Sequence, residues 1–282
     1  MLHLENHELR LDLLDPVADA VRQGPRYCWG GYVWQVHDRT HGPLLSGPVF
    51  PDPTPTPFDG QGLPESFRHL SRDGRNFTLR GRAGVAIGAG RLAVDDQNNV
   101  TLTEPCVWEI SPFADHLEFH TRQAAAGFSY ELLRRIELTD RTVRSHTQLT
   151  NHGEQPLVLQ WFPHPFFPLQ DGRTRADFPA GTTMPENPGF ALVDRTLTFK
   201  RPFTRKGDSQ FVLFGLPAGR ELSVVLDHPC LDRVEFSTSF APDECPVWGN
   251  AHTFSVEPYL NLDLAPGQTQ HWSVQTRFGP RI

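Results

Sequence analysis

The sequence is poor in cysteine, in positive charge and in long apolar runs, and each shortage narrows the class of protein. None of its cysteines belongs to a CxxC pair, and the four lie far apart, at Cys28, Cys106, Cys230 and Cys245. Disulfide frameworks depend on dense, regularly spaced cysteines. These four are therefore expected to be buried thiols that behave as small apolar residues in a reducing compartment.

Positive charge is in deficit, because 26 lysines and arginines face 33 aspartates and glutamates, for a formal net charge of −7. Nucleic-acid binding requires a clustered basic face, so we expect no nucleic-acid partner. No apolar run approaches the roughly 20 residues of a membrane span, so no membrane partner is expected. The first 16 residues alternate apolar with charged side chains. They lack the apolar core of a signal peptide, which predicts a cytoplasmic protein.

Proline, glycine and phenylalanine, by contrast, are abundant. The chain has 26 prolines and 23 glycines, and it has 20 phenylalanines against 4 tyrosines. Frequent proline and glycine interrupt helix interiors, whereas many large apolar rings can offset the entropy of ordering a chain. The composition therefore predicts a folded, all-β protein. We expect antiparallel sheets packed as a sandwich, forming a single domain over residues 1–282 with few short helices.

Apolar and polar residues alternate with the period of a β-strand in many segments, and turn residues separate these segments. The main predicted strands cover residues 9–14, 32–36, 99–103, 117–121, 128–138, 142–149, 157–162, 210–216, 222–226, 233–238, 253–257 and 270–278. Because no helix intervenes between neighbouring strands, the spacing predicts antiparallel pairing.

Three segments depart from this simple pattern. Residues 130–138 alternate imperfectly, and a β-bulge would account for the slip. Residues 42–64 are rich in proline with phenylalanines interleaved, which favours a rigid loop packed against the sandwich over a solvated linker. Residues 63–70 are the clearest helix candidate, with Pro64 near the first turn.

The most unusual local sequence is QWFPHPFFPL at residues 160–169. Its single histidine, His164, lies between two prolines, which fix the backbone on both sides. Trp161 and Phe167 flank it, and rigid aromatics beside a polar group are typical of sugar-binding sites, where rings stack on C–H faces. We interpret His164 as functional, with Trp161 and Phe167 as a wall of the site. The alternative is a core loop that contains an incidental histidine.

A second candidate is Glu257, at the end of the sequence FSVEPY. The carboxylate closes an apolar strand, and Pro258 stops that strand. A buried glutamate without a partner is costly, so its position favours the edge of an open site or a raised pKa. The alternative is a glutamate in solvent at a strand end.

A metal site is not expected, although the chain has 13 histidines. His116 and His120 are four residues apart, which on a strand places them on one face but about 13 Å apart. That separation is too large for two ligands of one ion. We therefore expect neither a metal nor an organic cofactor.

Taken together, these segments resemble the aldose 1-epimerase (galactose mutarotase) superfamily. The ordered motifs that carry the resemblance fall within residues 125–278 and are Asn151–Leu159, His164–Phe167, Val256–Tyr259, Leu264–Gly267 and Trp272. Gly30–Trp34 resembles the family's N-terminal strand more weakly. The resemblance implies a large antiparallel β-supersandwich. Where the family has a His-Gly motif near residue 80, this sequence has Leu79-Arg80-Gly81-Arg82.

The resemblance also implies an activity on a small-molecule carbohydrate, the interconversion of α and β anomers of an aldose or a modified aldose. Glu257 is the implied general base and His164 the implied general acid, and such proton transfers need no cofactor. Arg68 is a substrate-binding candidate by position, and Arg80 and Arg82 are candidates for holding hydroxyls or an anionic group.

Two other readings remain open on the same fold: a non-catalytic carbohydrate-binding or regulatory module, and a sugar isomerase or lyase. The sequence leaves the oligomeric state and the identity of the sugar undetermined.

Overall fold

The computed structural model describes residues 1–52, 59–71, 76–205 and 207–279. Strands dominate these residues, and the only helical element among them is the 3-10 turn η1 (Ala20–Arg22). The all-β class predicted from proline, glycine and phenylalanine content is confirmed.

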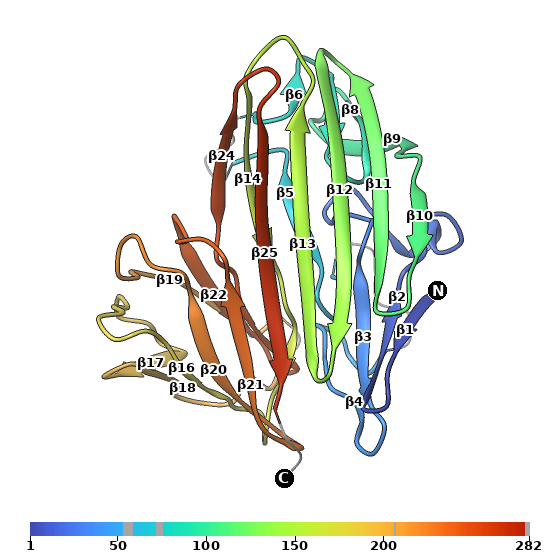
Figure 1. Ribbon diagram of the computed structural model, residues 1–282. Coiled ribbons are helices and arrows are strands. Elements are labelled where there is room, and N and C mark those ends of the chain that lie inside the picture. The colour runs from blue at the N-terminus through green and yellow to red at the C-terminus, as the bar shows by residue number, and fades with distance from the viewer. Residues whose placement is uncertain (53–58, 72–75, 206, 280–282) are drawn as a thin grey trace.

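The largest sheet has ten strands, and its long central strands lie side by side at the front of Figure 1. Every pair in it is antiparallel. Its spatial order is β10 (Glu109–Pro112), β11 (His116–Ala125), β12 (Phe128–Thr139), β13 (Thr142–Asn151), β25 (Thr269–Phe278), β21 (Leu231–Thr238), β20 (Ser223–His228), β16 (Arg175–Asp177), β18 (Thr196–Phe199) and β17 (Phe190–Val193).

Four smaller sheets complete the described part of the chain. Two of them hold the candidate residues: β24 (Leu260–Leu264), β14 (Leu157–Pro163) and β5 (Glu65–Arg68); and β15 (Phe167–Pro168), β23 (Thr253–Val256), β22 (Cys245–Gly249) and β19 (Gln210–Phe214). The other two are β1 (Leu2–Glu5), β2 (Leu9–Leu13), β3 (Val33–Asp38) and β4 (Gly42–Pro43); and β6 (Leu79–Arg80), β7 (Ala83–Ala86), β8 (Gly90–Val94) and β9 (Val100–Pro105).

Aromatic rings join the two sheets that hold the candidate residues to the inner face of the ten-stranded sheet. Trp272 of β25 contacts Trp161 of β14 and Phe67 of β5, with ring centroids 5.3 Å and 6.1 Å apart. Phe167 of β15 packs edge-on against Phe236 of β21 at 5.9 Å. Large buried rings supply most of the packing area in such layers. The predicted antiparallel sandwich is confirmed.

Strand β12 alternates without interruption, so the bulge expected in it is wrong. Its register is continuous against both β11 and β13. The apparent slip in sequence arises because Arg134 takes an inward position and Leu133 an outward one. The Nη1 atom of Arg134 lies 2.5 Å from Oε2 of Glu65, and its Nη2 donates to Ser145. A buried charge therefore stands where the pattern calls for an apolar side chain.

The helix expected over residues 63–70 is also wrong, because this segment contains strand β5. Its residues pair with β14, with Arg68 opposite Gln160 and Glu65 opposite Pro163. The pairing satisfies backbone groups that a helix would have satisfied internally, so tertiary contacts override the local propensity. The segment thereby becomes part of the layer that carries the candidate histidine.

The proline-rich segment 42–64 packs against the histidine segment through its backbone. Ser46 donates its N–H to the carbonyl of Phe166, and Phe166 donates its N–H to the carbonyl of Gly62, both at 2.8 Å. Residues 53–58 of the segment, including Phe58, lie outside the described residues. In its described parts, the segment is the packed loop that the sequence predicted.

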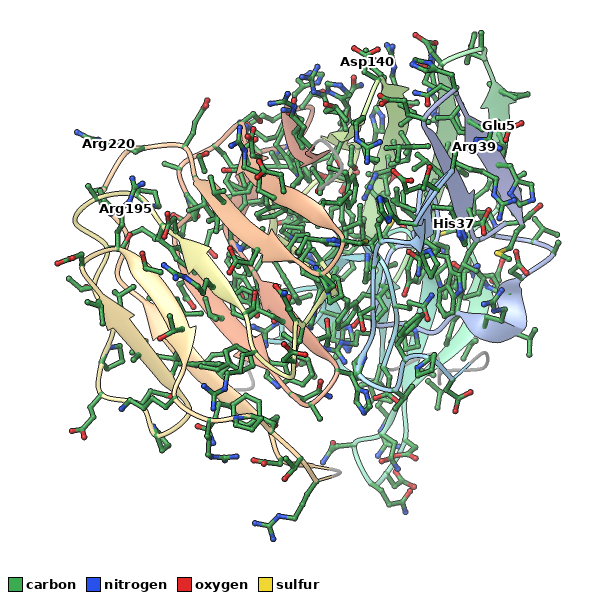
Figure 2. The ribbon with its side chains drawn as sticks, turned by 90° about the horizontal axis from the view of Figure 1, so that it is seen from below. Glu5, His37, Arg39, Asp140, Arg195 and Arg220 are labelled. Atoms are coloured by element: carbon green, nitrogen blue, oxygen red, sulfur yellow. The ribbon has the colours of Figure 1, made fainter. Side chains whose placement is uncertain are left out.

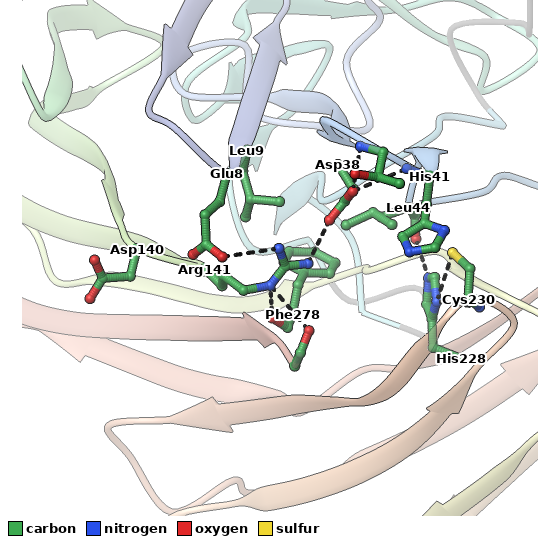
Figure 3. A network of polar contacts seen from close by, with 12 residues as sticks. Glu8, Leu9, Asp38, His41, Leu44, Asp140, Arg141, His228, Cys230 and Phe278 are labelled. Atoms are coloured by element: carbon green, nitrogen blue, oxygen red, sulfur yellow. Dashed lines mark hydrogen bonds and ion pairs between the residues drawn. The ribbon is translucent and has the colours of Figure 1, made fainter. Parts of the chain in front are cut away.

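A polar network fastens the N-terminal sheet to the end of the ten-stranded sheet, as Figure 3 shows. Arg141 donates to Asp38 at 2.8 Å and to the carbonyl of Phe278 at 2.8 Å, and it lies 3.5 Å from Glu8. Burial raises the pKa of Asp38, but hydrogen bonds from the Thr40 N–H and from Arg141 outweigh it and hold that pKa well below its ordinary value.

All four thiols are free and three of them are buried, as expected, whereas Cys230 is only half-buried. Burial raises the pKa of Cys28 to about 12, so this thiol stays protonated at neutral pH. Other charged side chains, such as Arg39, Glu5 and Arg195, lie at the periphery (Figure 2). Within the described residues, no helix is long and apolar enough to cross a membrane.

Candidate functional site

Strand β14 delivers His164 to the site by simple alternation. Trp161 points into the core and contacts Trp272, whereas Phe162 lies on the opposite side and stacks on Tyr259 with centroids 4.5 Å apart. Successive side chains of an extended chain face opposite ways. His164, two residues after Phe162, therefore lies on the same side as Phe162.

The two prolines beside His164 point away from it and into the interior. Both line a small internal gap of about 20 Å³ that Glu65 also lines. Between them, the His164 N–H donates to the carbonyl of Pro64 at 2.8 Å. Proline fixes its own φ, so the ring is held by a constrained backbone and by a hydrogen bond to the neighbouring segment. The sequence expectation that the prolines hold the histidine in place agrees with this geometry.

Strand β23 and the residue that follows it bring two polar side chains, Ser255 and Glu257, to the imidazole. Oγ of Ser255 lies 3.0 Å from Nδ1 of His164, and Oε1 of Glu257 lies 3.4 Å from its Nε2. Phe254 and Val256 alternate to the other side and are fully buried. The Glu257 N–H donates to the carbonyl of Pro246 at 2.8 Å, which fixes the strand end. The structure thus joins the two catalytic candidates, which are 93 positions apart in sequence.

Aromatic rings surround the imidazole and remove water from it. Phe166 stacks on His164 with centroids 4.4 Å apart. Tyr27 and Trp248 approach the ring edge-on at 6.1 Å and 6.2 Å. Burial among these groups lowers the pKa of His164 well below its ordinary value, and the positive charge of Arg26 lowers it further. The imidazole of the free protein is therefore neutral at neutral pH.

Ser255 suits both protonation states of this imidazole, because a hydroxyl can donate and accept. The carboxylate beside Nε2 favours a proton on that nitrogen, which leaves Nδ1 of the neutral ring to accept from Ser255. When the ring is cationic, Nδ1–H donates to the same oxygen. Nδ1–H remains when the cationic ring gives up its Nε2 proton, so the serine can hold the orientation of the ring before and after that transfer.

Two adjoining cavities open here, the first on both His164 and Glu257 and the second on Glu257. The first, which we call the histidine cavity, has a volume of about 300 Å³ and is lined by Arg26, Pro48, Asp59, His164, Phe166, Phe211, Trp248 and Glu257. The second, the arginine cavity, has a volume of about 470 Å³ and is lined by Pro25, Arg26, Ser66, Arg68, His69, Leu70, Val100, Phe162, Glu257 and Tyr259. Arg26 and Glu257 line both, so the two cavities meet at these side chains.

The structure places the five predicted substrate-binding residues in different surroundings. Arg68 lines the arginine cavity. Trp161 and Phe167 are buried in the core and pack against the ten-stranded sheet. Arg80 covers the ring of Phe128, and Arg82 forms an exposed ion pair with Asp96.

Of these five, Arg68 alone is among the described residues that line either cavity. Trp161 and Phe167 do not line either cavity because successive side chains of an extended chain face opposite ways. Both are odd-numbered, whereas the cavity-lining Phe162, His164 and Phe166 are even-numbered.

Comparison with known proteins identifies the architecture. No protein-family model matches the chain, and no curated protein matches it. Among solved structures, a galactose mutarotase related enzyme from Lactobacillus acidophilus matches with a TM-score of 0.64 at 12% identity, over 98% of this chain and 96% of that one. This chain has the galactose mutarotase-like fold.

Two further structures share the mutarotase-like fold. A galactose mutarotase-like protein from Clostridium acetobutylicum has a TM-score of 0.60 at 12% identity, covering 99% of this chain and 94% of that one. A galactose 1-epimerase from Lactobacillus acidophilus has a TM-score of 0.54 at 11% identity, covering 98% and 93%. Identities of this size establish the fold, and the chemistry is argued from the site itself.

In this mutarotase-like sandwich, sequence reasoning missed Ser255, Arg26 and Trp248. Ser255 carried a usable signal, because alternation in β23 places it on the same side as Glu257. Arg26 follows Gly24-Pro25, a turn signal that says nothing of where the guanidinium points. Trp248 comes from β22 and pairs with Ser255 across the ladder. The pairing of β22 with β23 is set by tertiary structure, and no local sequence pattern indicates it.

Proposed function

We propose that this protein interconverts the α and β anomers of an aldose or a modified aldose by general acid–base ring opening. One observation carries the proposal: an imidazole nitrogen and a carboxylate oxygen stand 3.4 Å apart where two cavities meet. The anomeric hydroxyl and the ring oxygen of a sugar are bonded to the same carbon. An acid and a base that serve them must therefore be neighbours, each within hydrogen-bond reach.

The proton transfers balance without a cofactor. Glu257 takes the proton of the anomeric hydroxyl as the C1–O bond to the ring oxygen breaks, and C1 becomes a carbonyl. Nε2–H of cationic His164 gives its proton to the departing ring oxygen. After rotation about the bond from C1 to C2, the reverse transfers close the ring on the other face and restore both groups.

The surroundings of the pair suit a sugar. Phe166 and Trp248 give the histidine cavity aromatic walls, and Phe162 and Tyr259 do the same for the arginine cavity. Aromatic rings favour C–H faces, while Arg26 and Asp59 supply a hydrogen-bond donor and an acceptor for hydroxyls.

A second candidate function, sugar binding without turnover, is favoured by one observation. Burial lowers the pKa of His164, so the free protein holds little of the cationic acid at neutral pH. A protein that binds sugars in these cavities without transferring protons would have the same cavity-lining residues.

Anomer exchange measured by NMR saturation transfer tests both functions on freshly purified protein. Each of His164→Ala and Glu257→Gln is expected to lower the catalysed rate by about 10²–10⁴. Arg195→Gln, a surface change at the β17–β18 turn (Figure 2), is the matched control and keeps the full rate. If the wild type never exceeds the spontaneous rate but is stabilised against heat by sugars, the binding module replaces the epimerase. If neither response occurs with a panel of aldoses and their phosphates, both functions are wrong.

A further inference from the structure

The arginine cavity contains the guanidinium of Arg68, which the side-chain amide of Gln160 holds in one orientation. Nη1 of Arg68 donates to Oε1 of Gln160 at 3.0 Å. The amide nitrogen of Gln160 in turn donates to Oδ1 of Asn261 at 3.0 Å. The guanidinium carbon lies 5.7 Å from the centre of the Tyr259 ring. These neutral partners fix the direction of Arg68 and leave its positive charge in place.

The two most buried ion-paired arginines of the described chain are held differently. Arg134 faces Glu65, and Arg141 faces Asp38 and Glu8. In both places a carboxylate neutralises the guanidinium, as is usual when such a charge leaves water. No carboxylate within ion-pair distance of Arg68 exists among the described residues. The cavity therefore retains a cation that a ligand can neutralise.

The other titratable groups that line the arginine cavity leave it with an excess of positive charge. Arg26 supplies a second guanidinium where the two cavities meet, and Glu257 supplies the carboxylate there. His69 also lines the cavity, and burial lowers its pKa, with the charge of Arg68 lowering it further. A group that the protein itself holds neutral beside Arg68 leaves the guanidinium as the main charge at that end.

We propose that the arginine cavity binds an anionic substituent of the substrate, a phosphate or a carboxylate, with Arg68 as the residue that recognises it. This inference rests on the proposed function, because it assigns a substrate class to the same site. The anomeric carbon lies at His164 and Glu257, and the rest of the sugar extends past Arg26 into the arginine cavity. Planar guanidinium forks match the oxygens of phosphate and carboxylate, and Gln160 presents the fork in a set orientation.

An anion at this place also assists the acid. The charge of Arg26 is one cause of the lowered pKa of His164, after burial. A negative group near Arg26 offsets that charge and favours the cationic imidazole. The substrate thereby helps to protonate the group that the proposed ring opening requires.

The test compares matched neutral and anionic sugars on wild type and on Arg68→Gln. The panel is glucose, glucose 6-phosphate and glucuronate, with galactose, galactose 6-phosphate and galacturonate as a second series. Turnover is measured by NMR saturation transfer and binding by titration calorimetry, and Arg195→Gln is the control. We expect wild type to prefer an anionic sugar in kcat/KM. Arg68→Gln should lower kcat/KM for that sugar 10- to 100-fold more than for its neutral counterpart, the size of a hydrogen bond to a charged group.

The outcomes separate this inference from the proposed function. Turnover of neutral sugars with no anion preference, or equal losses for both classes in Arg68→Gln, overturns the anion site and leaves the epimerase standing. Binding of an anionic sugar that needs Arg68, without turnover, supports the anion site and overturns the epimerase. The phosphate and carboxylate series show which anion is recognised, and failure of both to bind overturns the inference. Arg68→Lys, which keeps the charge and loses the fork, is expected to recover part of the preference.

Discussion

The buried pair of Arg134 and Glu65 allows a sharp test of what holds the sandwich together. Arg134 belongs to the ten-stranded sheet and Glu65 to β5, so the pair joins the two layers behind the candidate site. Their side chains are 1% and 5% exposed, which leaves almost no water to screen either charge. Apart from this ion pair, the guanidinium donates one hydrogen bond, from Nη2 to Oγ of Ser145. Within the described residues, Nε of Arg134 finds no acceptor.

The expected changes in the free energy of unfolding follow from the burial of this ion pair. Removing one partner leaves an uncompensated buried charge, so Arg134→Met and Glu65→Leu should each lower the free energy of unfolding by about 3–5 kcal/mol. Removing both leaves two apolar side chains of similar length, so the double variant should lie within about 1 kcal/mol of the wild type or above it. For a chain of this size, each single variant should melt roughly 6–20 °C lower.

Urea unfolding followed by tryptophan fluorescence measures all four proteins in one double-mutant cycle. The reasoning predicts a coupling energy of several kcal/mol, because each single loss is undone by the second change. The reasoning is refuted if each single variant loses less than about 1 kcal/mol of unfolding free energy. It is also refuted if the double variant loses the sum of the two single losses. Either result would mean that water or a rearranged backbone compensates the remaining charge.

Two more predictions concern histidines. Ser255→Ala removes the oxygen that accepts from Nδ1 of cationic His164, so the pKa of His164 should fall further and the acid-dependent limb of the kcat/KM profile should move to lower pH. A lower rate with an unmoved profile would instead assign Ser255 a packing role. Burial lowers the pKa of His69, His164 and His228. Below about pH 6.5 the unfolded chain therefore binds more protons, and the unfolding free energy should fall by up to about 1.4 kcal/mol per pH unit for each histidine. A urea midpoint that stays constant from pH 7.5 to pH 5 would contradict this.

Much of the fold could be predicted because burial on one face imposes a period of two on the sequence. The strands at 128–138 and 142–149 were predicted close to their observed bounds for this reason. Where prediction failed, a distant partner decided the outcome. The helix expected over 63–70 became β5 because β14 offers it a ladder. The expected bulge is absent from β12 because Glu65 forms an ion pair with the inward-facing Arg134, so regular alternation can continue.

The site was predictable in its two central residues and less so around them. His164 stood out through its flanking prolines and Glu257 through its strand-ending context, and the resemblance joined them. The aromatic character of Trp161 predicts a sugar-stacking ring, yet Trp161 lies on the core side of β14. The residues from other strands, such as Arg26, depend on contacts that only the folded chain makes.

Strand parity links the proposed chemistry to the proposed specificity. Gln160, which orients Arg68, Phe162, which stacks on Tyr259, and His164 are all even-numbered positions of one segment. A shift of register by one residue turns every side chain of a strand to the opposite face. The anion site and the acid therefore cannot be displaced independently by a slip of β14, since one slip would bury both and expose Trp161. The proposed acid and Gln160, which orients Arg68 of β5, lie on the same side of the β14 segment, and the packing of Trp161 on the opposite side against Trp272 holds both in register.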